Sequence, residues 1–305
     1  MSPTKKQILA LTGGFLAAYL LMRSLPVEPC EVLHTEKLDN AGVAEFCGPD
    51  EADYYPVTQM RFPVQAAFSP DGPLEARQRT RTYLTLTAPG GYPLDVSSIA
   101  TSHGEKVHLM LVDPSLDDYF HLHPAPTDEP GVFAFDFEPR QSGTYQAFLE
   151  FVSAETTRRI LLADSLEVRS ASLAAAVPSS APAPAFAGLR PVSVGELQVR
   201  LTGLPEPGMR PGERFTFGLE VSHPDRDALT FEPVMNSYAH LVVFDADRVG
   251  LAHAHPLDFN LATQPAVNPP LRFSVRLPEA GDYRLWAQFQ IDGKLHQAPF
   301  DLKVR

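Results

Sequence analysis

The sequence contains one histidine-bearing segment twice, and this repeat constrains the fold more than any other feature. The first copy, HLMLVDPSLDDYFHLHP, covers residues 108–124, and the second, HLVVFDADRVGLAHAHP, covers residues 240–256. In each copy a histidine opens an apolar run, an acidic turn follows, and His-x-His-Pro closes the segment. The histidines are separated by 13 and then 2 residues in both copies. Because the spacing is shared while other side chains differ, the three histidines are expected to hold fixed positions in a common fold.

Each copy has the pattern of a β-hairpin, with an apolar run before the turn and alternating residues after it. Side chains two residues apart on a strand point to one face, about 7 Å apart. If the loop has an even number of residues, for example 114–117, then His108 lies opposite His123 and on the face that His121 shares. An odd-numbered loop would place His108 on the other face of the sheet.

The composition indicates an all-β protein and makes nucleic-acid binding an unfavourable hypothesis. The net charge of −12 disfavours an electrostatic grip on nucleic acid or anionic lipid and attracts metal cations. Thirty prolines and many short Val, Phe, Tyr and Leu runs favour short strands joined by turns. No P-loop, nucleophile elbow or dinucleotide-binding glycine motif is present in the sequence.

The repeat divides the chain into two halves. We expect a first immunoglobulin-like β-sandwich over residues 61–169 and a second over 191–305, each with about seven strands. The likeness extends beyond the histidines, because SGTYQAFLEF from Ser142 matches AGDYRLWAQF from Ala280. Residues 170–190 are rich in Ala, Ser and Pro and are expected to form a linker.

The amino end has the features of a targeting element. Lys5 and Lys6 precede an apolar run over residues 8–22, which Arg23 ends. We expect residues 1–27 to be an uncleaved signal anchor in an inner membrane, with a cleaved signal peptide as the alternative. Either reading places the rest of the chain in the periplasm or another extracytoplasmic space.

Residues 28–60 are expected to form a stalk or wrapping segment that contains both cysteines of the chain. In an oxidising compartment Cys30 and Cys47 would form a disulfide, which would stabilise the loop by about 3 kcal/mol. A thiolate metal or redox pair is the alternative, although the spacing matches no ligand signature.

Three convergent imidazoles on neighbouring strands match the ligand geometry of zinc or copper sites. One fourth-ligand candidate precedes each triad by five residues: His103 in the first half and Met235 in the second. A thioether favours Cu(I), whereas imidazole favours Cu(II) or zinc, so the two sites are expected to differ in Cu(I) to Cu(II) preference. The alternative is that the histidines are structural and hydrogen-bonded. The candidate metal ligands are His108, His121, His123, His240, His253, His255, His103 and Met235.

The second half resembles the YtkA-like, heavy-metal-binding type of bacterial secreted β-sandwich. The resemblance is carried by FEPVMNSYAHLVVF, LAHAHP and LPEAGDYRLWAQFQIDGKLHQAPF, and the first half looks like a more diverged copy, with His103 where methionine is expected. It implies an extracytoplasmic domain that accompanies copper-handling proteins. By position it implies the site residues Met235, His240, His253 and His255, then His108, His121 and His123.

From these features we expect a metal-binding protein that is not an enzyme. It would sequester copper, or alternatively zinc, or pass the ion to a partner cuproprotein or membrane complex. One alternative is a non-catalytic adhesion or assembly module with structural histidines. Another is a zinc hydrolase or hydratase, for which Glu105 or Asp118 could serve as general base; neither of these acids repeats between the halves.

Overall fold

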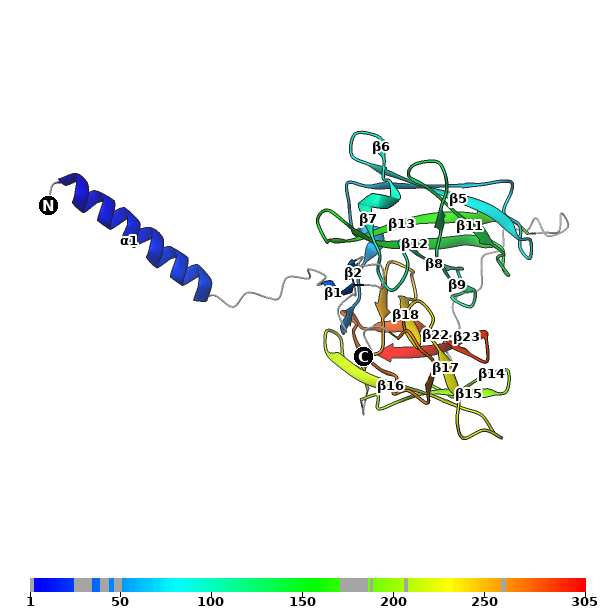
Figure 1. Cartoon of the computed structure of the whole chain (residues 1–305). Coiled ribbons are helices and arrows are strands. Elements are labelled where there is room, and N and C mark those ends of the chain that lie inside the picture. Colours follow the sequence, from blue (N-terminus) through cyan, green and yellow to red (C-terminus); the bar gives the residue numbers. More distant parts are fainter. Residues whose placement is uncertain are drawn as a thin grey trace. The chain divides into compact units, whose positions relative to one another are not determined.

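The computed structural model describes residues 3–24, 35–38, 44–46, 51–170, 186, 189–205, 208–258 and 262–305. It divides the chain into two compact units, Met1–Val32 and Leu33–Arg305. The first unit contains the helix α1 (Pro3–Ser24), which Figure 1 labels together with many of the strands. Among the described helices, none combines the length and apolar character that a membrane crossing requires. Cys30, Cys47 and most of the expected linker fall outside the described residues.

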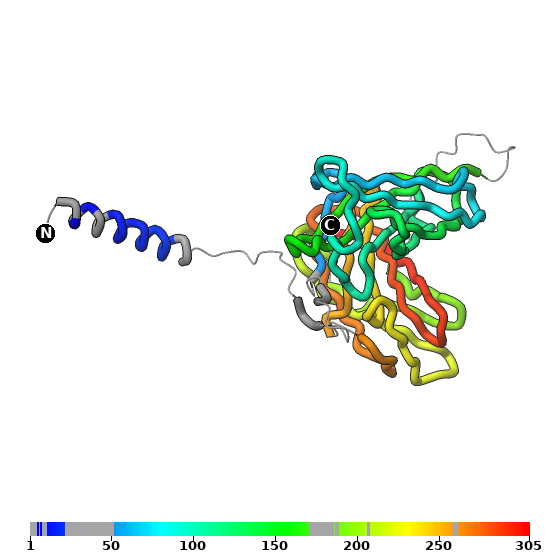
Figure 2. Tube along the Cα trace, turned by 45° about the horizontal axis from the view of Figure 1, so that its top comes forward, coloured from blue at the N-terminus to red at the C-terminus, as the bar shows by residue number. Residues whose placement is uncertain are grey.

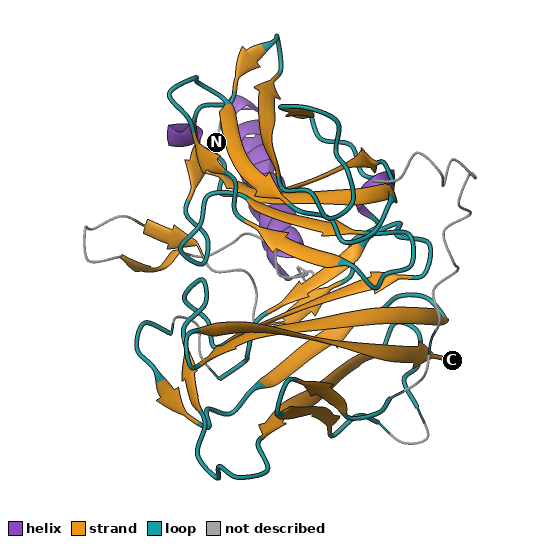
Figure 3. Cartoon of the chain, turned by 90° about the vertical axis from the view of Figure 1, so that its right-hand side faces the viewer, coloured by secondary structure: helices purple, strands orange, loops and turns teal. Residues whose placement is uncertain are grey.

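The second unit is predominantly β, as the sequence predicts (Figure 3). Its first half contains two mainly antiparallel sheets, with orders β10-β11-β5-β4 and β13-β12-β8-β9. The first of these sheets consists of β4 (Gln65–Pro70), β5 (Thr80–Ala88), β6 (Tyr92–Pro93), β10 (Ala125–Pro126) and β11 (Val132–Phe137). The other consists of β7 (Ile99–Ala100), β8 (His108–Val112), β9 (Tyr119–Leu122), β12 (Gly143–Ser153) and β13 (Arg159–Val168).

The second half also contains two sheets, with orders β14-β15-β16-β21-β3 and β19-β18-β22-β17-β20. The first consists of β14 (Val192–Val194), β15 (Leu197–Thr202), β16 (Arg214–Ser222), β21 (Arg272–Arg276) and β3 (Glu51–Asp53). The other consists of β17 (Thr230–Glu232), β18 (Ala239–Asp245), β19 (Leu251–Ala254), β20 (Ala266–Val267), β22 (Gly281–Ile291) and β23 (Lys294–Val304). Short elements elsewhere are β1 (Thr35–Leu38), β2 (Ala44–Phe46) and the 3-10 helices η1 (Val57–Gln59) and η2 (Val96–Ser98).

Strand alternation explains how each half builds its own core. On β8, Leu109 and Leu111 point into a cluster shared with the facing sheet, where Phe133 and Phe135 lie. On β18 the equivalent residues belong to a separate cluster in the second half. The residues that alternate with these on each strand point away from the core of their own half, because successive strand residues face opposite sides of a sheet.

The two halves pack against each other through these opposite faces, and Figure 2 shows the cyan-to-green half beside the yellow-to-red half. All five residues of β8 are buried, as expected for a strand that is covered on both sides. The buried apolar side chains between the halves, called the interface cluster here, are Val57, Met110, Val112, Leu116, Tyr119, Phe148, Leu161, Val242, Phe244, Leu251 and Trp286.

Polar contacts fix how each hairpin turn docks on the opposite half. Trp286 donates from Nε1 to the Leu116 carbonyl over 3.1 Å, and Arg284 donates to the same carbonyl over 3.1 Å. In the other direction Arg248 donates to the Thr144 carbonyl over 2.7 Å. The turn of each hairpin is therefore held by the half to which it does not belong.

Residues 51–58, within the expected stalk or wrapping segment, cover two sheet edges of the second half. β3 pairs in parallel with β21, and Asp53 pairs with Arg276 over 2.8 Å. Tyr55 then exchanges backbone hydrogen bonds with Leu251 on β19, over 2.9 and 3.1 Å. A side chain at position 250 would collide with the Tyr55 backbone, so glycine is required there. This part of the segment therefore packs on the second half.

Candidate metal centre

The hairpin register is the one that brings each opening histidine onto the face of its His-x-His pair. β8 pairs with β9 so that Leu109 lies opposite Leu122, and the loop is closed by Asp113 N donating to Asp118 O over 3.1 Å. β18 and β19 pair in the equivalent register, with Leu241 opposite Ala254. Of the two loop lengths considered from the sequence, the even-numbered one is present in both copies.

The aspartate at the start of each turn stabilises that turn by accepting hydrogen bonds from its backbone. The Asp113 carboxylate accepts from the backbone nitrogens of Asp117 and Asp118, over 2.9 and 2.8 Å. The Asp245 carboxylate accepts from Asp247 N and Gly250 N, over 3.1 and 2.9 Å. These bonds fix the two-strand register on which the position of the histidines depends.

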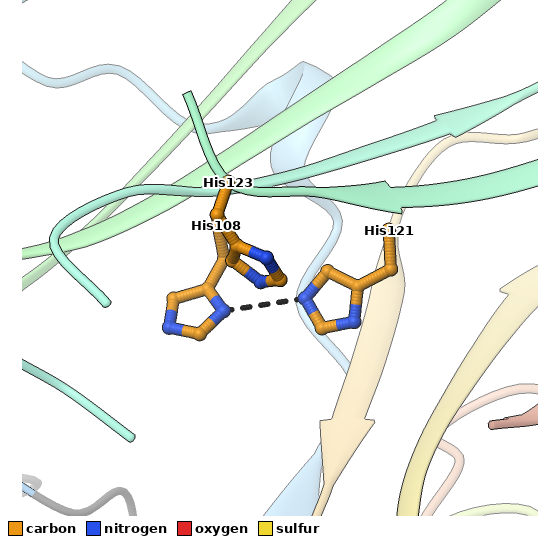
Figure 4. Close-up of side chains that lie close together, drawn as sticks. All are labelled: His108, His121 and His123. Atoms are coloured by element: carbon orange, nitrogen blue, oxygen red, sulfur yellow. Dashed lines mark hydrogen bonds between the residues drawn. The ribbon is translucent and has the colours of Figure 1, made fainter. Parts of the chain in front are cut away.

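The first triad comprises His108, His121 and His123, one nitrogen from each lying within 4.8 Å of the others. Figure 4 shows the three rings turned toward one another, with His108 Nδ1 and His121 Nε2 3.2 Å apart. The ring of His123 is 5.0 Å from that of His108 and 4.8 Å from that of His121, measured between centroids.

The second triad comprises His240, His253 and His255 and has the same compactness, again with one nitrogen from each within 4.8 Å. Ring centroids lie 4.7 Å apart for His253 and His255, and 4.7 Å for His240 and His255. In both triads the first two histidines are buried and the last is half-buried. His123 and His255 therefore form the more accessible side of the two groups.

The structure places the two triads next to each other at the interface between the halves. The centroid of His121 lies 5.1 Å from that of His253 and 5.6 Å from that of His240. The His108 ring lies 5.7 Å from the His253 ring. The sequence analysis treated the triads as sites of separate domains, because a repeat says nothing about how its copies dock. Together with His103, the six residues form what is called the histidine cluster below.

His103 lies against the second triad, across the interface from the half that carries it. Its ring stacks on that of His255, with centroids 3.6 Å apart and an interplanar angle of 17°. Met235, half-buried, occupies the equivalent turn: both residues have positive φ, 50° for His103 and 51° for Met235. The sequence assigned His103 to the first site. The turn that carries His103 instead contacts the second half. Gly104, the next residue, lies so close to Asn236 that an added Cβ atom would be 3.2 Å from Asn236 Nδ2.

Two residues that the sequence analysis did not select hold the histidines from behind. Glu150 Oε2 accepts from His253 Nδ1 over 3.1 Å, and Gln288 Oε1 lies 3.2 Å from His121 Nδ1. Glu150 and Gln288 occupy equivalent strand positions, opposite His108 and His240 respectively. Each reaches the histidine of the other half. The matching segments SGTYQAFLEF and AGDYRLWAQF have a polar residue at the same place, Glu150 in one and Gln288 in the other, and this was the signal that could have identified them.

These contacts determine which ring nitrogen is free to bind an ion. His108 Nε2 donates to the Ser102 carbonyl over 3.0 Å, so Nδ1 carries the lone pair. With Gln288 accepting from Nδ1 of His121, Nε2 of that ring also carries a lone pair. The 3.2 Å between these two nitrogens is close to the edge of about 3.3 Å for a tetrahedron whose nitrogens lie about 2.0 Å from a metal.

Several buried ring nitrogens have no hydrogen-bond partner among the described residues. They are His103 Nδ1 and Nε2, His123 Nε2, His240 Nδ1 and Nε2, His253 Nε2 and His255 Nε2. A buried polar atom without a partner is costly, and such atoms are rare in folded proteins. A cation at the centre of each triad would bind one nitrogen of each of its three histidines, which accounts for part of this set; the two nitrogens of His103 lie outside the triads.

Burial favours the neutral form of most imidazoles in the cluster. Burial, followed by the charges of neighbouring histidines, lowers the pKa of His103 to about 3 and that of His108 to about 4. The same causes hold the pKa of His121, His240 and His255 well below the usual value. Neutral imidazoles present the lone pairs that metal binding needs, and at neutral pH no proton has to be displaced.

Glu150 stays ionised beside them. Burial alone raises the pKa of its carboxyl, but Arg159 and His253 outweigh burial and hold the pKa well below the usual value. Arg159 Nε donates to Glu150 Oε1 over 2.7 Å, and its guanidinium lies over the Tyr55 ring. An ionised carboxylate that accepts from a ligand histidine orients the ring and increases its basicity.

The metal-free protein is expected to lose stability in acid. Unfolded histidines titrate near pH 6.5, whereas the folded pKa is about 3 for His103 and about 4 for His108. The contribution of these two histidines to the free energy of unfolding is therefore fully present above pH 6.5. It is lost as the pH falls toward the folded pKa values, because the unfolded chain binds more protons than the folded chain. The expected loss is on the order of 3 kcal/mol for each of the two groups at pH 4, and Glu150 adds a loss of the same sign. Urea unfolding midpoints measured with a chelator at pH 7.5, 6, 5 and 4 would check this; a constant midpoint would contradict it.

Comparison with known proteins adds a family and little else. No curated protein matches the chain. A crystal structure of a DUF4785 family protein from Legionella pneumophila is similar at 11% identity and a TM-score of 0.26, over 80% of this chain and 58% of that one. The chain thus spans somewhat more than half the length of that protein. A family model described as Domain of unknown function (DUF8832) matches residues 64–163 and 192–305, more than half of the chain, and the protein belongs to that family.

Proposed function

We propose that this protein binds copper through its two histidine triads, in an extracytoplasmic compartment, and sequesters the ion or delivers it to a partner cuproprotein. One observation carries the proposal: six imidazoles converge in two compact groups, and several of their buried ring nitrogens have no hydrogen-bond partner in the part of the chain that the structure describes. Structural histidines would be expected to have their buried nitrogens hydrogen-bonded. The unpartnered nitrogens favour a ligand over that alternative.

Copper is proposed ahead of zinc on the chemistry of the donors. Imidazole suits both ions, and three imidazoles in a tetrahedral arrangement fit either. The methionine at the turn of the second half, Met235, would add a thioether that selects Cu(I), and His103, at the equivalent turn of the first half, lies beside His255 of the second triad. Zinc remains the alternative occupant.

A role in binding and transfer fits the placement of the histidines better than catalysis. Four of the six triad histidines are buried, and only His123 and His255 reach the half-buried margin. At these half-buried histidines, the ligands of a partner protein can replace the histidine ligands of the ion one at a time. Export is proposed from Lys5, Lys6 and the apolar run over residues 8–22, which suits a cleaved signal peptide or a short anchor.

We also infer that each half is an immunoglobulin-like sandwich. In both halves a tyrosine on the long central strand hydrogen-bonds the backbone four residues upstream. The Tyr145 hydroxyl accepts from Gln141 N over 3.2 Å, and Tyr283 donates to the Glu279 carbonyl over 2.9 Å. This is the arrangement of a tyrosine corner.

Elemental analysis of the purified full-length protein tests the proposed function. After incubation with Cu(II) and exhaustive dialysis, the wild-type chain is expected to retain copper. The H121A/H123A and H253A/H255A variants are each expected to retain less, because two of three ligands are removed from one triad. H223A is the matched control, since the His223 ring lies 3.3 Å from Glu196 and outside the cluster. Wild-type protein that retains neither copper nor zinc would refute the proposal and leave a module with structural histidines.

A further inference from the structure

The distances within the histidine cluster do not separate it into two sites. Within one triad, ring centroids lie 5.4 Å apart for His108 and His121 and 5.7 Å apart for His240 and His253. Across the interface the separation between His121 and His253 is 5.1 Å. Histidines of different triads are thus as close as histidines of one triad, and ions held in the two triads would be near neighbours.

The contacts behind the ligands also cross the interface. Glu150 of the first half orients His253 of the second, and Gln288 of the second half contacts His121 of the first. The His103 ring covers His255 in the same crosswise manner. Neither triad is therefore complete within its own half, because the residues that orient its ligands come from the other.

We propose that the two triads are the two sides of one dinuclear copper centre, built between the halves, in which the ions share a bridging ligand. The inference rests on the proposed function, since it presupposes that the triads bind copper. It differs from that function in the number of ions, in their proximity and in the requirement for both halves.

The charge of the two copper ions determines the chemical nature of the bridging ligand. A histidine binds a metal through the lone pair of its neutral ring, and the carboxylate that contacts the cluster, Glu150, is already paired with Arg159. Two Cu(II) ions repel each other about four times as strongly as two Cu(I) ions at the same separation, because the energy follows the product of the charges. The oxidised pair therefore needs an anion between the ions. A water molecule bound to both cations supplies it by releasing one proton to solvent, which leaves a bridging hydroxide.

Electron paramagnetic resonance of the copper-loaded full-length protein tests the inference. The protein is titrated with CuSO4 in a non-coordinating buffer, and bound copper is measured by elemental analysis on the same sample. We expect two copper ions per chain together with a spin count well below two, because the two unpaired electrons couple through the bridge. H108A and H240A, which remove equivalent ligands, are each expected to bind one ion and to show a signal of one full spin. Removing a ligand would thus increase the signal per bound ion.

The outcomes separate this inference from the proposed function. Two copper ions per chain with an ordinary signal of two independent spins would overturn the dinuclear centre and leave copper binding intact. A single ion per chain in the wild type would overturn it as well. Absence of bound copper would refute the proposed function itself. If either variant fails to fold, as judged by its circular dichroism, the wild-type spin count alone decides between coupled and independent ions.

Discussion

Removing bound metal is expected to lower the melting temperature of the protein by about 10 °C or more. A ligand that binds only the folded state at a free concentration of about 1,000 times its Kd stabilises that state by about 4 kcal/mol. For a chain of this size each kcal/mol shifts the melting temperature by roughly 2 to 4 °C. The effect should be large here because the ligands come from both halves, so that an ion in the cluster holds the interface together as well as each hairpin.

Differential scanning calorimetry with free copper buffered at about 1,000 times its Kd, and with excess chelator, measures this shift. The H121A/H253A variant, which lacks one ligand of each triad, is the control and should melt at nearly the same temperature in both conditions. Equal melting temperatures for the wild-type protein with and without metal would contradict the expectation.

The Trp286→Ala variant is expected to destabilise the protein by about 3 to 5 kcal/mol and to weaken copper binding. Trp286 stacks on Tyr119, with centroids 5.5 Å apart, and donates to the Leu116 carbonyl. Both contacts join the halves, so a cavity there loosens the packing that sets the distance between the triads. Trp286 is not part of the histidine cluster. Any loss of copper affinity in the variant would therefore come from a change in the relative position of the two triads.

Trp286→Phe is the matched control, because the equivalent residue of the first half is Phe148. It retains an aromatic ring and loses one hydrogen bond, for an expected cost of about 1 kcal/mol. Urea unfolding gives the stability of each variant, and competition with a chromophoric copper chelator gives the affinity. If the alanine variant binds copper as tightly as the phenylalanine variant, the interface does not position the triads.

The sequence predicted part of the local geometry of the site. The shared offsets in the two copies placed three histidines on each hairpin, and the two-residue period of a strand placed His121 and His123 on one face. Whether His108 shares that face depended on an even- or an odd-numbered loop, which the sequence left open. The predominantly β character followed from the same patterns.

The docking of the halves could not be predicted in the same way. Met110 and Val112 on β8 follow histidine in an unbroken apolar run, which indicates a strand covered on both faces but does not name the covering partner. Which surfaces meet depends on side chains far apart in the sequence, such as Trp286 against Leu116. The placement of His103 on His255, and the contacts of Glu150 and Gln288, follow from this docking, so they were missed for the same reason.

The short segment that crosses both sheets of the second half has a consequence for any shortened version of the protein. Residues 51–58 occupy the border of β21 in one sheet and of β19 in the other. A chain that began at residue 61 would expose backbone donors and acceptors on both borders, and such bare borders recruit strands from other molecules. Recombinant fragments intended to remain monomeric should therefore start before Glu51, even though the family match begins at residue 64.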